Sequence, residues 1–141
     1  MGIGYRIDKA LGLTLVVWDG VVTGEDAEDH VRALFDDPDW PPGRIHLLDA
    51  SSAKSVPIVA NTKLVDLAVN AAETRRIRFA LVQHMGFEEA TYFEREASTR
   101  GLSQVIVFND ISTACTWLGL DGAAIRAMTA DMRREIRELE A

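Results

Sequence analysis

The stretch Gln104-Val-Ile-Val-Phe-Asn-Asp-Ile-Ser-Thr-Ala-Cys-Thr-Trp-Leu-Gly119 decides the fold class of this chain. Its apolar β-formers, Val105 to Phe108, predict a buried strand. Asn109 and Asp110 follow directly, and both residue types cap helices. Apolar residues then recur at helical spacing as far as Gly119, a residue type that often ends a helix. The stretch therefore predicts a strand that turns at once into a short helix, as in α/β domains.

The rest of the chain predicts the same alternation. We expect strands at residues 3–7, 13–18, 45–48 and 77–82, and helices at about 23–35, 57–72 and 86–100. The first two strands form an antiparallel hairpin, and the later strands, separated by helices, pair in parallel. The expected fold is α/β, with a mixed sheet of about five strands in the order β-β-α-β-α-β-α-β-α.

A C-terminal helix is expected over about residues 122–140. Its apolar residues recur at steps of three and four: Ile125, Met128, Met132, Ile136 and Leu139. This narrow stripe either packs the helix on its own domain or joins two copies of the chain as a homodimer. Trp40, in a proline-rich loop, poses a similar alternative: it packs against the first helix or stands exposed as an anchor for a protein partner.

Length and charge limit the classes of function. A chain of 141 residues is expected to form a single domain over residues 1–141. Its net charge of −7, from 22 acidic and 15 basic residues, argues against binding to nucleic acid or to an anionic membrane. Because no signal-peptide pattern or membrane-spanning run occurs, we expect a cytoplasmic protein. Cys115, the only cysteine, lies on a helix stripe and favours packing over catalysis.

Three local patterns point to a known family. They are Asp37-Pro-Asp-Trp-Pro-Pro-Gly43, Leu47-Leu-Asp49 and Val107-Phe-Asn-Asp-Ile-Ser-Thr-Ala-Cys-Thr-Trp-Leu118. Over residues 1 to about 120, their order and spacing resemble the SpoIIAA-like group of small bacterial STAS-type proteins. The resemblance implies a mixed sheet with helices, no catalytic machinery and no cofactor. Related STAS domains are anti-sigma-factor antagonists, transporter regulatory domains or ligand sensors, and the broad fold also resembles Sec14-type lipid carriers.

The sequence departs from this family at the phosphorylation motif. Phosphorylatable STAS antagonists carry Asp-Ser-Ser-Gly at the start of the helix after the third strand, whereas this chain has Asp49-Ala-Ser-Ser-Ala53. Here Asp49 resembles the aspartate that ends the strand, several residues before that motif. Ser55, two residues before Pro57, lies nearest the expected helix start. Phosphorylation of Ser55 is therefore a hypothesis that the departure weakens.

Polar residues follow the expected carboxyl ends of the parallel strands, where open α/β sheets bind ligands. They are Asp49, Ser51, Ser52, His84, Gly86 and Asn109. A helix opening at Gly86 would offer free N–H groups to an anion, although side chains at such turns often only cap the backbone. His84 and Asp49 could form an acid–base pair. His46 is expected as a satisfied core histidine and His30 at the boundary of the first helix, and the three scattered histidines make no metal motif.

The leading hypothesis is a non-catalytic regulatory or protein-interaction module without a metal. One alternative is a carrier or sensor of a small apolar or anionic ligand. The other is a weak enzyme that uses His84 and Asp49.

Overall fold

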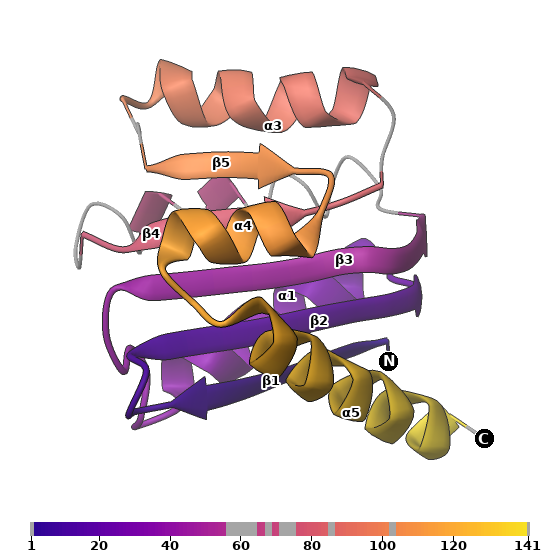
Figure 1. Cartoon of the computed structure of the whole chain (residues 1–141). Coiled ribbons are helices and arrows are strands. Elements are labelled where there is room, and N and C mark those ends of the chain that lie inside the picture. Colours follow the sequence, from indigo (N-terminus) through magenta and orange to yellow (C-terminus); the bar gives the residue numbers. More distant parts are fainter. Residues whose placement is uncertain are drawn as a thin grey trace.

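The fold of the chain is described by a computed structural model that covers residues 2–55, 65–66, 69–70, 76–84, 87–101 and 104–140. In this part of the chain a five-stranded sheet carries helices on both faces (Figure 1). The strands are β1 (Ile3–Asp8), β2 (Leu13–Val21), β3 (Ile45–Ser55), β4 (Arg78–Val82) and β5 (Val105–Phe108), and the helices are α1 (Gly24–Asp36), α3 (Phe87–Thr99), α4 (Ile111–Leu118) and α5 (Gly122–Glu140). Most of the helix expected over residues 57–72 lies outside the described residues.

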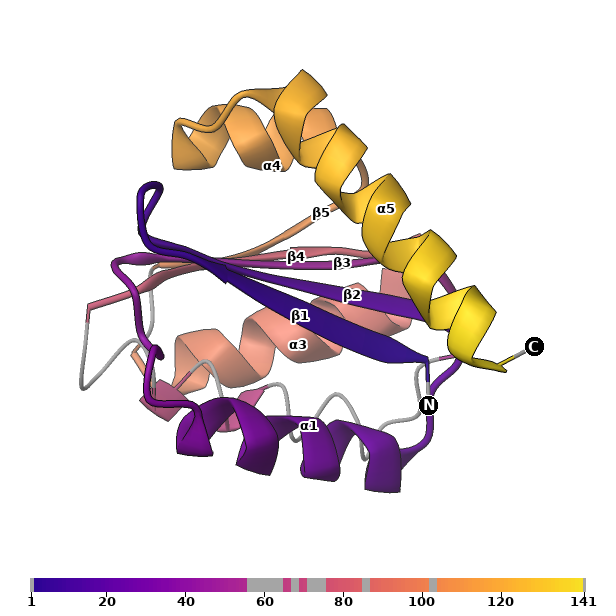
Figure 2. The ribbon, with the colours of Figure 1, turned by 90° about the horizontal axis from the view of Figure 1, so that it is seen from below.

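The strands lie in the sheet in their sequence order, from β1 to β5. β1 is antiparallel to β2, and every other neighbouring pair is parallel. Helices α1 and α3 cover one face of the sheet, while α4 and α5 cover the other (Figure 2). The predicted mixed α/β sheet is therefore confirmed, together with the C-terminal helix.

Local capping explains where the helices begin and end. Thr23 forms the capping box of α1 with Asp26, because each side chain accepts a hydrogen bond from the other residue's backbone N–H. At α4 the Asp110 side chain accepts from the Ser112 N–H at 3.1 Å, and Gly119 ends the helix at a φ of 73°. The stretch that decides the fold class thus folds as predicted, with Asp110 as the capping residue.

Alternation along β2 divides the interior into two apolar layers. Val16 and Trp18 point to the face of α1 and α3, whereas Leu15 and Val17 point to the face of α4 and α5. All four side chains are buried. A strand that buries both of its faces needs apolar residues at successive positions, which explains the continuous apolar run of β2.

The third strand is longer than the sequence indicated. The sequence predicts a strand over residues 45–48, but β3 continues to Ser55 because β2 also continues past Asp19 to Val21. The two extensions pair in parallel with irregular register, including Asp19 opposite Ser52. Gly20, with a φ of 69°, accommodates this irregularity.

Helix α5 packs on its own sheet through the predicted stripe. Ile125, Met132 and Ile136 are buried, and Met128 is partly buried against the same apolar layer. Leu139 stays outside, with 88% of its surface exposed. The structure thus uses most of the stripe within the chain, as the first of the two alternatives states. None of the described helices is long and apolar enough to cross a membrane.

Trp40 packs against the end of the first helix. Its ring lies 4.8 Å, centroid to centroid, from that of Phe35 near the end of α1. The side chain is half-buried, and its Nε1 has no hydrogen-bond partner within the described part of the chain. This placement matches packing against the first helix rather than a fully exposed anchor.

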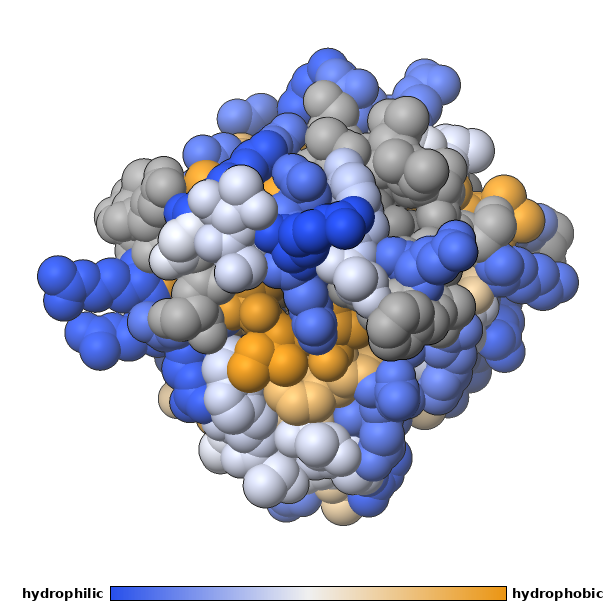
Figure 3. All heavy atoms as spheres, turned by 90° about the horizontal axis from the view of Figure 1, so that it is seen from above, coloured by the Kyte–Doolittle hydropathy of each residue, from blue (hydrophilic) through white to orange (hydrophobic). Residues whose placement is uncertain are grey.

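The outer edge of the sheet at β5 carries apolar surface. β5 has only four residues, and Ile106, Val107 and Phe108 are half-buried. The N–H of Val107 donates to Glu94 Oε1 at 3.3 Å, which occupies a backbone donor at this edge. Seen from the side of α3 and β5, apolar atoms gather between hydrophilic groups (Figure 3).

Two histidines are buried on the α1 face. His46 is 0% exposed and stacks on Phe79 at 4.6 Å, and neither ring nitrogen has a hydrogen-bond partner among the residues that the structure describes. It is thus a core histidine, but not a satisfied one. His30 is buried rather than at a boundary, with an edge contact to Tyr5. Burial lowers the pKa of His30 to about 4 and, together with the charge of nearby His30, that of His46 to about 3.

The loop that leads into β3 depends on a close approach of two glycines. A Cβ on Gly43 would lie 2.6 Å from Gly12 Cα, while Gly12 has a φ of 63°. We expect Gly43→Ala to destabilise the domain by about 1–3 kcal/mol in urea unfolding, because two backbone segments would have to separate. Gly4→Ala is the control, since its Cβ would meet only the flexible end of Ile136 at 3.4 Å. Equal stability of the two variants would contradict this account.

The buried histidines predict an acid-sensitive domain. Their pKa values of about 4 and 3 in the folded chain lie below the unfolded value near 6.5. The unfolded chain therefore takes up protons first, and stability is lost as the pH falls below about 6.5. We expect each histidine to contribute a slope of about 1.4 kcal/mol per pH unit to the free energy of unfolding.

Urea unfolding between pH 7 and 5 measures these slopes. His46→Leu should remove one histidine's share of the slope. An unaltered slope in His46→Leu would show that this histidine does not set the acid sensitivity.

Candidate functional site

Two buried carboxylates lie on β2 and β3, and Asp49 is opposite Val82 at the carboxyl end of β4. Asp49 is 1% exposed and Asp19 is 6% exposed. By strand alternation both side chains point to the face that α4 and α5 cover, as Val17 and Leu47 do. An ionised carboxylate is unfavourable in such a position unless a cation and hydrogen bonds accompany it. Both are supplied by α5.

Arg133 compensates Asp49. Its Nη2 donates to Asp49 Oδ2 and, at 3.2 Å, to the hydroxyl of Ser51, and its Nε donates to the hydroxyl of Ser52 at 3.0 Å. Ser51 also donates to Asp49 Oδ1, from its hydroxyl at 2.6 Å and from its amide at 3.0 Å. The strand-end polar residues thus form one connected network with the C-terminal helix.

Arg137, one helical turn further on, compensates Asp19. Its Nε and Nη2 donate to the two carboxylate oxygens at 2.9 and 3.0 Å, a bidentate arrangement. These hydrogen bonds from Arg137 hold the pKa of Asp19 below its usual value, and the same contact raises the pKa of Arg137. Asp19 therefore stays ionised to lower pH than a free aspartate.

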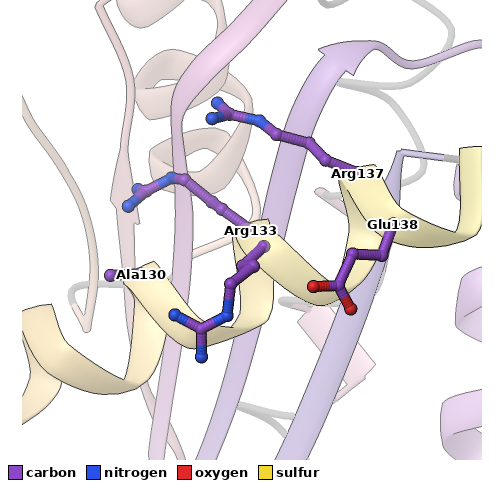
Figure 4. A pocket seen from close by; sticks show the side chains of 5 residues that line it. Ala130, Arg133, Arg137 and Glu138 are labelled. Carbon is purple, nitrogen blue, oxygen red and sulfur yellow. The ribbon is translucent and has the colours of Figure 1, made fainter. Parts of the chain in front are cut away.

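A hollow of about 430 Å³ opens beside these arginines. It is lined by Ala130, Arg133, Arg134, Arg137 and Glu138, all on α5 (Figure 4). Sequence reasoning did not identify Arg133 or Arg137 as site residues. One signal was present: each follows a residue of the apolar stripe, Met132 or Ile136, so it borders the face that packs on the sheet.

Of the residues expected at the strand ends, the structure brings together Asp49, Ser51 and Ser52. His84 is exposed, and no hydrogen bond joins it to Asp49, whose oxygens are taken by Arg133 and Ser51. The acid–base pair is therefore not formed in this structure. Asn109 is exposed beyond β5, outside the network.

The remaining candidates fall elsewhere. Gly86 lies outside the described residues. Ser55 is the last residue of β3, opposite Val21, rather than at a helix start. The described ranges hold no group of three or more His, Cys, Asp or Glu placed to bind a metal. Burial raises the pKa of the Cys115 thiol, which keeps it protonated and unreactive near neutral pH.

Comparison with known proteins places the fold. No family profile and no curated protein sequence matches this chain. Among solved structures, it is similar to an uncharacterized protein of the DUF3478 family with a SpoIIAA-like fold, from Shewanella loihica PV-4. The match has a TM-score of 0.56 at 17% identity and covers 83% of this chain and 93% of the other. The fold is therefore SpoIIAA-like, as the sequence patterns predicted.

The network predicts an asymmetric response to mutation. We expect Arg133→Met to destabilise the domain by about 3–5 kcal/mol in urea unfolding, because it leaves Asp49 buried without a cation. The double variant Asp49→Asn/Arg133→Met should recover most of this loss, because the amide carries no charge. Arg134→Gln, which removes an arginine whose side chain is 64% exposed, should change stability by less than about 1 kcal/mol. A double variant as unstable as Arg133→Met would contradict the pairing.

Proposed function

We propose that this chain is a non-catalytic regulatory module of STAS-like type, which acts by binding a partner. The observation that carries the proposal is the engagement of Asp49. This buried carboxylate, at the strand ends where open α/β sheets place their chemistry, is held by Arg133 and Ser51 of the same chain. A group fixed in this way serves structure and offers no free base or nucleophile to a substrate.

The fold supports a binding role at the level of class. SpoIIAA-like domains are not a known class of enzyme, and the Shewanella loihica neighbour is itself uncharacterized. A fold specifies a scaffold, whereas function depends on the residues at a site. Here the residues at the strand ends and the scaffold favour the same class.

The enzyme alternative has less support. It would need His84 and Asp49 within hydrogen-bonding reach of each other or of one substrate proton. His84 is exposed, whereas Asp49 is buried beneath α5, so the two side chains have different access to solvent. Moving Arg133 aside would expose Asp49, but it would also remove the cation that makes its burial tolerable.

In this proposal the partner is either a second copy of the chain, which gives a homodimer, or a different protein. Ile125, Met132 and Ile136 are already packed on the chain's own sheet, so a second copy would meet other residues. Leu139, 88% exposed at the end of α5, is an apolar residue available for such a contact. A different protein is the other form of partner.

Native mass spectrometry of freshly purified protein tests the proposal. We expect the 15.6 kDa chain to appear in a complex of defined stoichiometry with another polypeptide, either a second copy or a different protein. The complex should persist in His84→Ala, because the proposed binding does not use that side chain. A bare monomer in both samples would contradict the module, and a monomer that retains a small molecule would favour the carrier or sensor.

A further inference from the structure

The two arginines of the strand-end network keep part of their hydrogen-bonding capacity unused. A guanidinium group has five N–H donors. Arg133 uses Nε and Nη2, and so does Arg137. Within the described part of the chain, Nη1 of either residue donates no hydrogen bond. Two guanidinium edges are thus free, one helical turn apart.

These edges are held in place from beneath. Asp49 and Asp19 are almost fully buried, whereas the side chains of Arg133 and Arg137 are 21% and 63% exposed. The carboxylates therefore lie on the protein side of the arginines, and the guanidinium groups on the solvent side. Because the buried carboxylates fix both groups, a ligand would not have to order two flexible side chains on binding.

The hollow of about 430 Å³ joins the two edges to a third cation. Arg134 lines it as well and has its Nη2 on Asp131 at 2.5 Å, while Ala130 leaves space because its side chain is small. Glu138 is the one carboxylate in the lining. Each of the three arginines is already paired with an aspartate, so what the hollow offers to an anion is oriented N–H donors rather than an excess of positive charge.

We propose that this hollow binds a phosphate-type oxyanion. The Nη1 groups of Arg133 and Arg137 donate to it, and Arg134 contributes a third positive charge. A phosphate group carries two negative charges and several acceptor oxygens, and so it matches separate guanidinium edges better than a single planar carboxylate does. The volume lies within the range of small-ligand sites, so the phosphate could be free or part of a larger molecule.

Glu138 is expected to weaken this site. Its carboxylate lies on the far side of the helix from the Arg137 guanidinium in Figure 4, yet it borders the same hollow. A carboxylate that borders the hollow repels a bound anion, and we expect this repulsion to weaken the affinity about fivefold. Removing the Glu138 charge should therefore tighten binding, which is an effect that general loss of structure would not produce.

Titration with inorganic phosphate tests the site, with sodium chloride used to hold the ionic strength constant. Nitrogen-15 NMR of the arginine Nε–H groups should show saturable shifts at Arg133 and Arg137. Glu138→Gln should lower the dissociation constant about fivefold, and Arg134→Gln should raise it by a similar factor. Arg32→Gln is the matched control, because Arg32 is 65% exposed on α1 and its ion pairs, like that of Arg134, are local to its helix.

The control should leave the dissociation constant unchanged. Shifts that do not saturate, or that respond equally to Arg32→Gln and Arg134→Gln, would overturn the proposal, as would an unchanged affinity in Glu138→Gln. Parallel titrations with glycerol 3-phosphate and with a phosphoserine peptide distinguish the sources of the phosphate. Tighter binding of either than of inorganic phosphate would identify which one the hollow prefers. Neither result depends on whether the chain binds a protein partner.

Discussion

The burial of Asp19 and Asp49 beneath α5 is the constraint on which the C-terminal part of this structure depends. Each carboxylate would be left buried and unpaired if its cation were removed, which is unfavourable. Arg137 and Arg133 supply those cations at the same time only when α5 lies in one register across the strand ends. The apolar contacts of Met132 and Ile136 add buried area, but apolar area alone is not directional. We infer that the apolar stripe stabilises the docking of α5 and that the ion pairs fix its position.

The same constraint limits what the strand ends are able to do. In open α/β sheets this rim is the usual place for a ligand, because several strands end there together. In this chain Arg133 lies at the rim and donates hydrogen bonds to Asp49, Ser51 and Ser52. The N–H donors that remain unused are on the solvent side of the two guanidinium groups. Recognition of a ligand is thereby shifted from the strands to the helix that covers them.

The sequence predicted most of the fold because its signals are local. The capping pair Thr23 and Asp26 and the helix between Asp110 and Gly119 depend only on nearby residues. The extension of β3 was missed because its polar residues 51–55 resemble a loop, and only pairing with the tail of β2 makes them a strand.

The arginines of the site, Arg133 and Arg137, were missed for a similar reason. Arg133 lies 84 positions from Asp49, and Arg137 lies 118 positions from Asp19. The residues next to Asp19 and Asp49 in the sequence do not indicate which distant cation compensates each of them.

The two faces of the sheet treat buried polar groups in opposite ways. Under α5 the carboxylates are charged and paired, and Arg137 keeps the pKa of Asp19 low. On the α1 face, His46 is held neutral, with no hydrogen-bond partner for its ring nitrogens. Gln83 and the Trp18 indole nitrogen, both buried, also lack hydrogen-bond partners among the described residues. Acidification thus acts first through the two buried histidines of the α1 face, because below about pH 6.5 they take up protons in the unfolded chain but not in the folded one. The ion pair of Asp19 with Arg137 persists to lower pH, so we expect the histidines of the α1 face to set the acid limit of the domain.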